Sequence, residues 1–460
     1  MAIISKHKGR ERSRELNKKR PLYETLCIIA LIASILFKLV YAIRVPYNLS
    51  PHDLNLTSDW TNIPDGHLGY IQYMYQYKHL TDFSPADYPS QYYHPPLFYI
   101  LSAFIMGMFD PMKNNNLSSA FEAIQLFNML IAAMIPVVAF RTFKALELKE
   151  TGLFWATCLI SFSPALYPIG AALNSDCLMT FFLSLVILNA VRWAKKQDMI
   201  TIAKIGLFLA LAMLSKTSGV LIAPALAVLF LWILIEKKEQ FKKLLPQYIV
   251  FGLISIPLGL SWVLREYMLF GVPFNYVLEQ SVDSFQYIGD CSLLERIGVP
   301  SYYEITEVKI LWEHRQSYSN IWGQTLLTMA LDEGILAVPN LLAYYLLLLL
   351  YWSNSILFIC SFVAFLVSLF FKIVPAKIRV FFLTGVTTLL ASYILFAFQQ
   401  PFICTMNFRY IATILIFFFA SVGIVGTYKQ TVSPWAKATI TYVISFVSLY
   451  TSIVYIIYAK

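Results

Sequence analysis

The sequence predicts an all-α polytopic membrane protein, and three observations support this class. Hydrophobic residues make up 58% of the 460-residue chain and charged residues only 13%, which is about half the charged fraction of a typical soluble protein. Apolar runs of about 17 to 23 residues recur from end to end, and each is long enough to cross a hydrocarbon core of about 30 Å. Lysine and arginine gather in alternate connections between these runs, as is typical of membrane proteins.

The apolar runs predict a bundle of about 11 transmembrane helices. We place these helices at residues 22–43, 120–140, 152–171, 177–193, 201–215, 218–235, 247–264, 354–371, 380–398, 409–427 and 436–458. One further apolar stretch, residues 335–352, is long enough to span, but counting it would invert the side of every later connection. We therefore expect it to lie at the outer interface or to lead into the span that begins at residue 354.

The positive-inside rule orients the bundle. The N-terminal tail, residues 1–21, contains "KHKGRERSRELNKKR" and lacks a small-residue cleavage site, so we interpret it as a cytoplasmic flank and not as a signal peptide. The other basic connections are 141–150, 192–198, 236–243, 372–379 and 428–437. With these in the cytoplasm, the long connections 44–119 and 265–353 face outward. The net charge of +9 then reports membrane orientation more than nucleic-acid binding.

The first outer loop, 44–119, contains the segments "IPDGHLGYIQYMYQYKHL" and "YYHPPLFYILSAFIMGMF". Pro95 and Pro96 suit a helix start, where a missing N–H costs little. The apolar stretch after them is about 14 residues long, too short to span, so it predicts an interfacial helix. An aromatic belt at the membrane surface explains the tyrosines of this loop. It does not explain the three ionisable residues Asp65, His67 and His94.

Further ionisable residues stand at the outer ends of the predicted spans: Asp176, Lys216, Arg265, Glu266 and Arg409. Charges at membrane depth are costly and usually face a polar cavity or a partner. Each has a structural alternative, since acids can cap helices and long cations can extend to the interface. Likewise, the histidines can be hydrogen-bonded structural groups, and the neighbours at 265 and 266 can form an ion pair. Their convergence on one membrane face favours a shared site.

An acid beside fixed cations at a lipid–water boundary suits the transfer of a group from a lipid phosphate. The carboxylate can act as general base toward an acceptor hydroxyl. Lysine and arginine can bind the phosphate on which negative charge develops as it leaves.

Several segments resemble the GT-C superfamily of membrane glycosyltransferases, which includes protein O-mannosyltransferases and lipid A aminoarabinose transferases. The resemblance covers most of residues 22–240. It is carried by "PDGHLGYIQYMYQY", "YYHPPLFYIL", "SPALYPIGAALNSDCLMTFFLSL", "AMLSKTSGVLIAPAL" and, near the end, "MNFRYIATIL". The resemblance implies a GT-C-type bundle with interfacial helices in the first outer loop. It also implies a catalytic transmembrane module at 22–264, an acceptor side at 265–353 and C-terminal transmembrane helices at 354–460.

By this resemblance Asp65 is the expected catalytic base. Family members often have Asp-Glu there, whereas this chain has Asp65 followed by Gly66, so a role for a second acid is absent or moved. Some relatives also carry a lysine after the two prolines, and none follows Pro96 here. The remaining expected substrate-binding residues are His67, His94, Asp176, Lys216, Arg265, Arg409 and Tyr410. Aromatic residues that can stack on a sugar of the acceptor are Trp312, Tyr318 and Trp322, and packing on the membrane surface is their alternative role.

The resemblance implies an inverting transfer from a polyprenyl-phosphate sugar, undecaprenyl in bacteria or dolichyl in eukaryotes. The sequence agrees in lacking a Gly-rich phosphate loop for a nucleotide sugar. Because the outer loops are compact, we expect a cell-envelope glycan or glycolipid acceptor, with the active site on the outer face of a bacterial plasma membrane. A protein O-mannosyltransferase-type activity, a transporter or flippase of lipid-linked sugars, and a non-catalytic scaffold are the alternatives.

The expected partners are therefore the lipid-linked donor, the glycan acceptor and membrane lipids, with no nucleic acid. No cofactor is certain. Metal use varies across the superfamily, so a divalent metal stays open, but the sequence shows no compact Asp/His cluster that would argue for one. Cys291 and Cys404 both fall on the outer side, where a disulfide and a pair of thiols are both compatible with the sequence.

Overall fold

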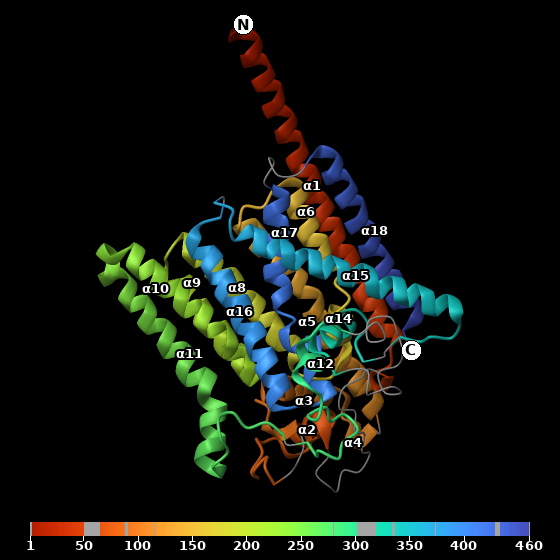
Figure 1. Ribbon diagram of the computed structural model, residues 1–460. Coiled ribbons are helices and arrows are strands. Elements are labelled where there is room, and N and C mark those ends of the chain that lie inside the picture. Colours follow the sequence, from red (N-terminus) through yellow and green to blue (C-terminus); the bar gives the residue numbers. More distant parts are fainter. Residues whose placement is uncertain are drawn as a thin grey trace.

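The protein is nearly all helical in the computed structural model shown in Figure 1. The structure describes residues 2–49, 65–87, 91–114, 116–278, 280–300, 319–333, 336–372, 374–427 and 433–459, with side chains from Leu22 onward. Over these residues the only extended pairing is two isolated bridges, Tyr287 with Phe402 and Leu336 with Ala459. The predicted all-α class is confirmed.

The α-helices are α1 (Ala2–Arg44), α2 (Gly66–Tyr77), α3 (Leu97–Phe109), α4 (Pro111–Asn114), α5 (Leu117–Ala145), α6 (Glu150–Ser161), α7 (Leu166–Ala171), α8 (Asp176–Lys195), α9 (Met199–Ser215), α10 (Ala223–Glu236), α11 (Phe241–Phe270), α12 (Leu293–Ile297), α14 (Ile321–Ala330), α15 (Leu341–Ser368), α16 (Ala376–Gln399), α17 (Ile414–Thr427) and α18 (Pro434–Tyr458). Short 3₁₀ helices are η1 (Tyr47–Leu49), η2 (Gln91–Tyr93), η3 (Thr217–Ile222), η4 (Lys238–Gln240), η6 (Ile403–Met406) and η7 (Phe408–Ile411).

Eight helices among the described residues are long and apolar enough to cross a membrane, and up to nine if the bent pair 403–411 and 414–427 is one span. The predicted count of about 11 is thus not confirmed. The expected span 152–171 is divided into α6 and α7, because Pro164 lies between them and has no N–H for a helical bond. The expected span 201–215 corresponds to α9, which has only 17 residues.

The ambiguous stretch 335–352 does not form a separate interfacial helix. From Leu341 it is the first half of the 28-residue helix α15, whose N-cap Asn340 accepts a hydrogen bond from the Ala343 N–H at 2.9 Å. Figure 1 shows α15 running obliquely across its neighbours. The stretch therefore leads into the next span, which is the second of the two predicted alternatives.

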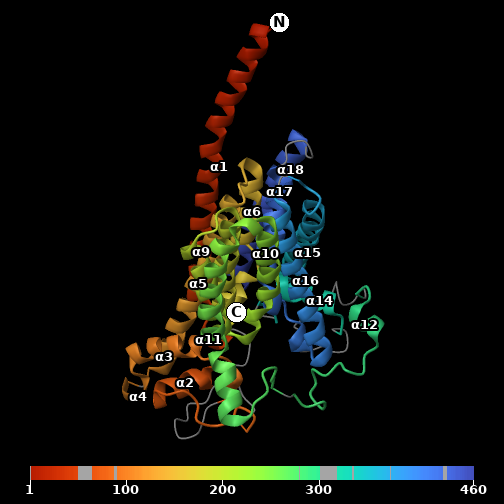
Figure 2. The same ribbon diagram turned by 90° about the vertical axis from the view of Figure 1, so that its left-hand side faces the viewer.

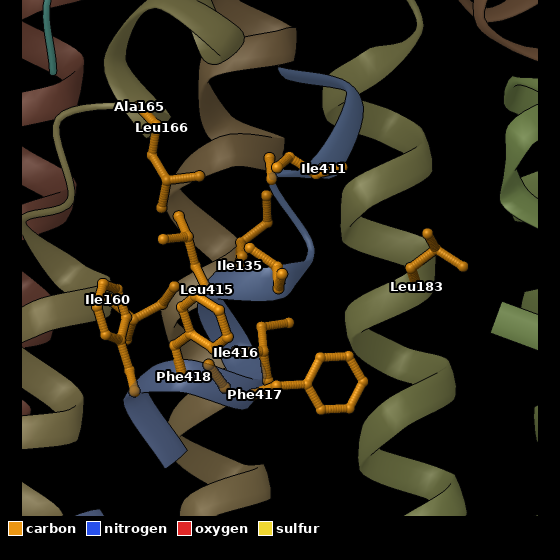
Figure 3. Packing of buried hydrophobic residues seen from close by; sticks show 14 of the residues in the cluster. Ile135, Ile160, Ala165, Leu166, Leu183, Ile411, Leu415, Ile416, Phe417 and Phe418 are labelled. Carbon is orange, nitrogen blue, oxygen red and sulfur yellow. The ribbon is translucent and has the colours of Figure 1, made fainter. Parts of the chain in front are cut away.

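The core of the bundle is formed where α5, α6, α8 and α17 meet. Figure 3 shows Phe417 and Phe418 of α17 among apolar side chains of α5, α6 and α8. The axes of α6 and α17 approach closely at two glycines, since a Cβ on Gly152 would lie 2.3 Å from the Gly423 carbonyl oxygen. Small residues at such crossings permit the tight packing on which membrane helices rely.

The short helices α2, α3 and α4 lie together at the end of the bundle away from the N-terminal extension of α1, as Figures 1 and 2 show. Helix α3 begins at Leu97 directly after the two prolines and is 13 residues long, as the sequence predicts for an interfacial helix. A second apolar cluster, which includes Tyr70, Tyr99 and Phe121, packs α2 and α3 on the start of α5. This packing fixes the first outer loop against the ends of the transmembrane helices.

Candidate functional site

Three charged side chains from distant parts of the sequence meet at one point. Asp176 is the first residue of α8 and is 2% exposed. The Nζ of Lys216 lies 2.5 Å from its Oδ1, and the Nε of Arg409 lies 3.7 Å from its Oδ2. A buried carboxylate between two cations is the kind of arrangement in which burial of charge is tolerated.

Local backbone breaks place these side chains. Lys216 is in extended conformation between α9 and η3, so its side chain leaves the helix axis where the helix ends. Asp176 begins α8, and its N–H donates to the Asn174 side chain at 3.1 Å. Arg409 lies in η7, a single 3₁₀ turn before the bend into α17.

Tyr410 packs against both cations. The Nζ of Lys216 is 4.7 Å from the centroid of the Tyr410 ring, and the guanidinium carbon of Arg409 is 5.2 Å from it. The Arg409 Nη2 also donates to the Tyr410 hydroxyl at 3.2 Å. The aromatic face therefore holds two cations beside one carboxylate, which favours an anionic ligand at this point.

The two histidines of the first outer loop lie beside this cluster. Their rings stack, with the centroids of His67 and His94 5.4 Å apart, and the His67 Nδ1 lies 2.7 Å from the Tyr99 hydroxyl. Burial, with the nearby positive charges of Lys216, His67 and Arg409, lowers the pKa of His94 well below its ordinary value. This shift favours the neutral imidazole of His94, which lies beside the cluster.

Asp65 is the N-cap of α2 and is exposed. Its Oδ1 accepts a hydrogen bond from the Gly66 N–H at 2.6 Å, so the capping alternative is realised. Gly66 has a φ of +71°, a backbone conformation that residues other than glycine rarely adopt. This explains why glycine, and not a second acid, follows Asp65. His67 is the second residue of the same helix, which places the acid next to the stacked histidines in the chain.

Arg265 and Glu266 are at the end of α11 and bond to each other, as the ion-pair alternative expected. Arg265 also donates to the Thr81 carbonyl oxygen at 2.5 Å, and Trp262 one turn earlier donates to the Tyr93 carbonyl oxygen at 3.1 Å. These contacts brace the first outer loop against α11. The role of Arg265 in substrate binding stays a prediction.

The structure adds three residues that sequence reasoning did not assign. The Asn407 amide nitrogen donates to Asp332 at 3.0 Å and to Glu333 at 2.8 Å, while its oxygen accepts from the Arg409 N–H at 2.8 Å. Asp332 is buried and has a φ of +54°. The only signal in the sequence was the acidic pair in "LDEG", which carries no spacing that identifies its partner.

The other predicted features have mixed outcomes. Trp312 and Tyr318 lie outside the described residues, and Trp322 donates to the Ile297 carbonyl oxygen at 3.1 Å. Cys291 and Cys404 are both thiols and are not joined. Among the described residues no group of three or more His, Cys, Asp or Glu could hold a metal ion, so the geometry does not decide the question of a divalent metal.

Comparisons with known proteins support the predicted resemblance. Residues 93–262 match the family model described as dolichyl-phosphate-mannose-protein mannosyltransferase. No curated protein sequence matched the chain. The oligosaccharyltransferase of Archaeoglobus fulgidus, in its apo form, superposes with a TM-score of 0.51 at 14% identity, over 94% of this chain and 56% of that one. The chain thus spans little more than half the length of that enzyme.

Two further solved structures are similar. The Archaeoglobus fulgidus oligosaccharyltransferase tethered to an acceptor peptide matches with a TM-score of 0.51 and 13% identity over the same 94% of this chain and 55% of the other. ArnT from Cupriavidus metallidurans bound to undecaprenyl phosphate matches with a TM-score of 0.38 and 12% identity, over 86% of this chain and 76% of that one. The two matches with a TM-score of 0.51 support the fold.

Proposed function

We propose that this chain, which has the fold of the GT-C membrane glycosyltransferases, is itself a glycosyltransferase. It would transfer a sugar from a polyprenyl-phosphate donor to a cell-envelope glycan or glycolipid. The observation that carries this proposal is the cluster of Asp176, Lys216 and Arg409 around the ring of Tyr410. It puts two cations and an aromatic face at the end of the bundle where the interfacial helices lie.

The phosphate of the donor would bind Lys216 and Arg409. Both form charge-assisted hydrogen bonds readily, and their hold on an oxyanion strengthens as negative charge develops on the leaving group. Asp176 keeps both cations in place, and the stacked His67 and His94 border the same space. The family model that matches residues 93–262 is described by a dolichyl-phosphate sugar, which favours this ligand class.

Asp65 would act as general base. Its carboxylate takes the proton of the acceptor hydroxyl as that oxygen attacks the anomeric carbon. The bond between the anomeric carbon and the phosphate oxygen breaks, its electron pair stays on the oxygen, and free polyprenyl phosphate leaves. A single displacement of this kind inverts the anomeric configuration. The acid is exposed at the start of α2, where an acceptor can reach it.

Asn407 is proposed as a positioning residue for Arg409. It fixes the backbone of η7 from one side and the acidic pair Asp332 and Glu333 from the other. Through this amide the loop after α14, on the proposed acceptor side, is connected to the residue that would bind the phosphate. We expect this arrangement to keep the Arg409 guanidinium on the Tyr410 ring and away from the carboxylates of Asp332 and Glu333.

A protein acceptor is the second candidate. The match of residues 93–262 to the protein-mannosyltransferase family model favours it, because that region includes His94, Asp176 and Lys216 of the candidate site. We also propose that the site faces the outside of the plasma membrane with the N-terminus in the cytoplasm, as the distribution of basic connections predicts.

The test uses purified protein in lipid with a panel of undecaprenyl- and dolichyl-phosphate sugars. Release of free polyprenyl phosphate is measured alone, with crude cell-envelope glycan and with unglycosylated polypeptide. Release that depends on one donor and on the glycan supports the proposal and names both substrates, whereas release that depends on the polypeptide supports the second candidate. Binding of a lipid-linked sugar without release under any condition contradicts it and supports a transporter.

A further inference from the structure

A groove separate from the candidate site lies between the C-terminal half of α2 and one face of α3. Its volume is about 800 Å³, and it is open on one side. Figure 2 shows α2 and α3 side by side at the end of the bundle, next to the short helix α4. The α2 residues that line the groove begin at Met74, whereas Asp65 and His67 are at the other end of α2. A helix of 12 residues is about 18 Å long, so the two features are distinct.

The floor of the groove is an apolar stripe on α3. Ile100, Phe104 and Met108 follow one another at intervals of four residues and are 43%, 70% and 68% exposed. Residues at this spacing lie on one helix face, and the stripe is about 12 Å long. Gly107 keeps the floor low, since a Cβ there would meet only the Tyr75 ring, at 3.9 Å. These dimensions fit part of an acyl chain.

The other end of the groove is cationic. Lys113 lies 3.1 Å from Asp110, and the Tyr75 hydroxyl donates to the same carboxylate at 2.8 Å. These hydrogen bonds, with the nearby charges of Lys113 and Lys78, lower the pKa of Asp110. Lys78 and Lys113 both line the groove together with Asp110, which already accepts these two hydrogen bonds, and His79 lines it as well. The balance of charge at this end is positive.

We propose that this groove binds an anionic phospholipid of the surrounding bilayer. Its phosphate would contact Lys78 and Lys113, and one acyl chain would lie along Ile100, Phe104 and Met108. The groove is complementary to such a lipid, because its cations lie at one end of an exposed apolar stripe and the stripe is on a helix too short to span the membrane. This lipid is not the sugar donor, and the inference does not depend on the proposed reaction. Its effect would be to hold α2 and α3 at a fixed depth in the interface.

The test is photolabelling in nanodiscs of mixed phosphatidylcholine and phosphatidylglycerol. Each lipid in turn carries a photoactivatable group in one acyl chain, and labelled peptides are mapped by mass spectrometry. The expected result is preferential labelling of the α3 peptide by the phosphatidylglycerol probe. Lys78→Gln and Lys113→Gln should each lower this preference by about fivefold, since a lysine near an anionic lipid surface contributes about that factor.

Two further variants separate the parts of the proposal. Gly107→Leu fills the floor of the groove and should lower labelling by both probes, while Lys204→Gln, an exposed lysine of α9, should leave it unchanged. Millimolar inorganic phosphate should not compete. Equal labelling by the two lipids that the lysine variants do not alter would overturn the proposal. Competition by inorganic phosphate would replace it with a simple phosphate site.

Discussion

The ion pair of Asp176 and Lys216 permits a prediction that separates stability from catalysis. The oxygen–nitrogen distance of 2.5 Å puts the two charge centres within about 4 Å of each other, and both side chains are largely buried. At an effective dielectric constant of about 20, two such charges attract by about 4 kcal/mol. Removing one member of a buried pair costs about 3 to 5 kcal/mol, because the other charge is left in a poor environment.

The perturbation is a double-mutant cycle of Asp176→Asn, Lys216→Gln and the combined variant. We expect Lys216→Gln to destabilise at the low end of that range, since Arg409 still lies 3.7 Å from the carboxylate. The double variant should recover much of the loss, which gives a coupling energy of at least about 1 kcal/mol. It should not recover polyprenyl phosphate release, because the lysine that holds the leaving phosphate is still missing.

Stability in this cycle is measured as the free energy of unfolding in mixed micelles, and activity as release of polyprenyl phosphate. The matched control is Lys195→Gln, whose ion pair with Glu147 is exposed and should contribute less than about 1 kcal/mol. Additive stability changes for Asp176 and Lys216 would refute the structural argument. Recovery of activity in the double variant would refute the assignment of Lys216 to the phosphate.

Three other predictions concern the loop, the core and the positioning amide. The folded-state pKa of His94 is lowered, so its contribution to stability is complete above the unfolded pKa of about 6.5. Below that pH the contribution is lost, by up to about 1.4 kcal/mol per pH unit. His94→Gln should therefore reduce the slope of the unfolding free energy against pH between about pH 6.5 and 5. Gly152→Ala should cost about 1 to 3 kcal/mol in unfolding free energy, because its Cβ would meet the Gly423 oxygen. The control Gly252→Ala, whose Cβ would meet only Ile256 at 3.8 Å, should be neutral or stabilising. Equal effects of the two variants would contradict the close crossing of α6 and α17. Asn407→Ala should raise the KM for the lipid-linked donor about tenfold with a smaller change in kcat, as expected from the loss of about 1.4 kcal/mol of binding, and an unchanged KM would exclude a positioning role.

The membrane helices were largely predictable because hydrophobic length is a local property of the sequence. The breaks were less predictable, since they depend on contacts between distant segments as well as on local residues such as Pro164. Helix α6 ends where the Ser161 carbonyl oxygen accepts hydrogen bonds from Lys38 at 2.6 Å and Ser34 at 2.5 Å. Both donors are in α1, more than 120 residues away, and no window of sequence around Ser161 contains them.

The site was predictable to the extent that its members are charged. Asp176, Lys216 and Arg409 stand out in apolar surroundings, so the cost of burying them predicted a common location. Asn407 gave no such signal, because a neutral amide is as common in solvated loops as in buried ones. The role of Gly66 also needed the structure, since the sequence shows the absence of a second acid but not the positive φ that explains it.

Whether Asp65 is the general base is tested by the release of polyprenyl phosphate by Asp65→Asn, with donor binding measured on the same samples. Asparagine caps a helix about as well as aspartate, so α2 should stay folded while the base is lost. Asp198→Asn, at the N-cap of α9, is the matched control for a cap without chemistry. We predict that Asp65→Asn binds donor normally and releases at least about a hundredfold less product, while Asp198→Asn is unchanged. Full activity in Asp65→Asn would contradict the account and leave Asp65 as a helix cap alone.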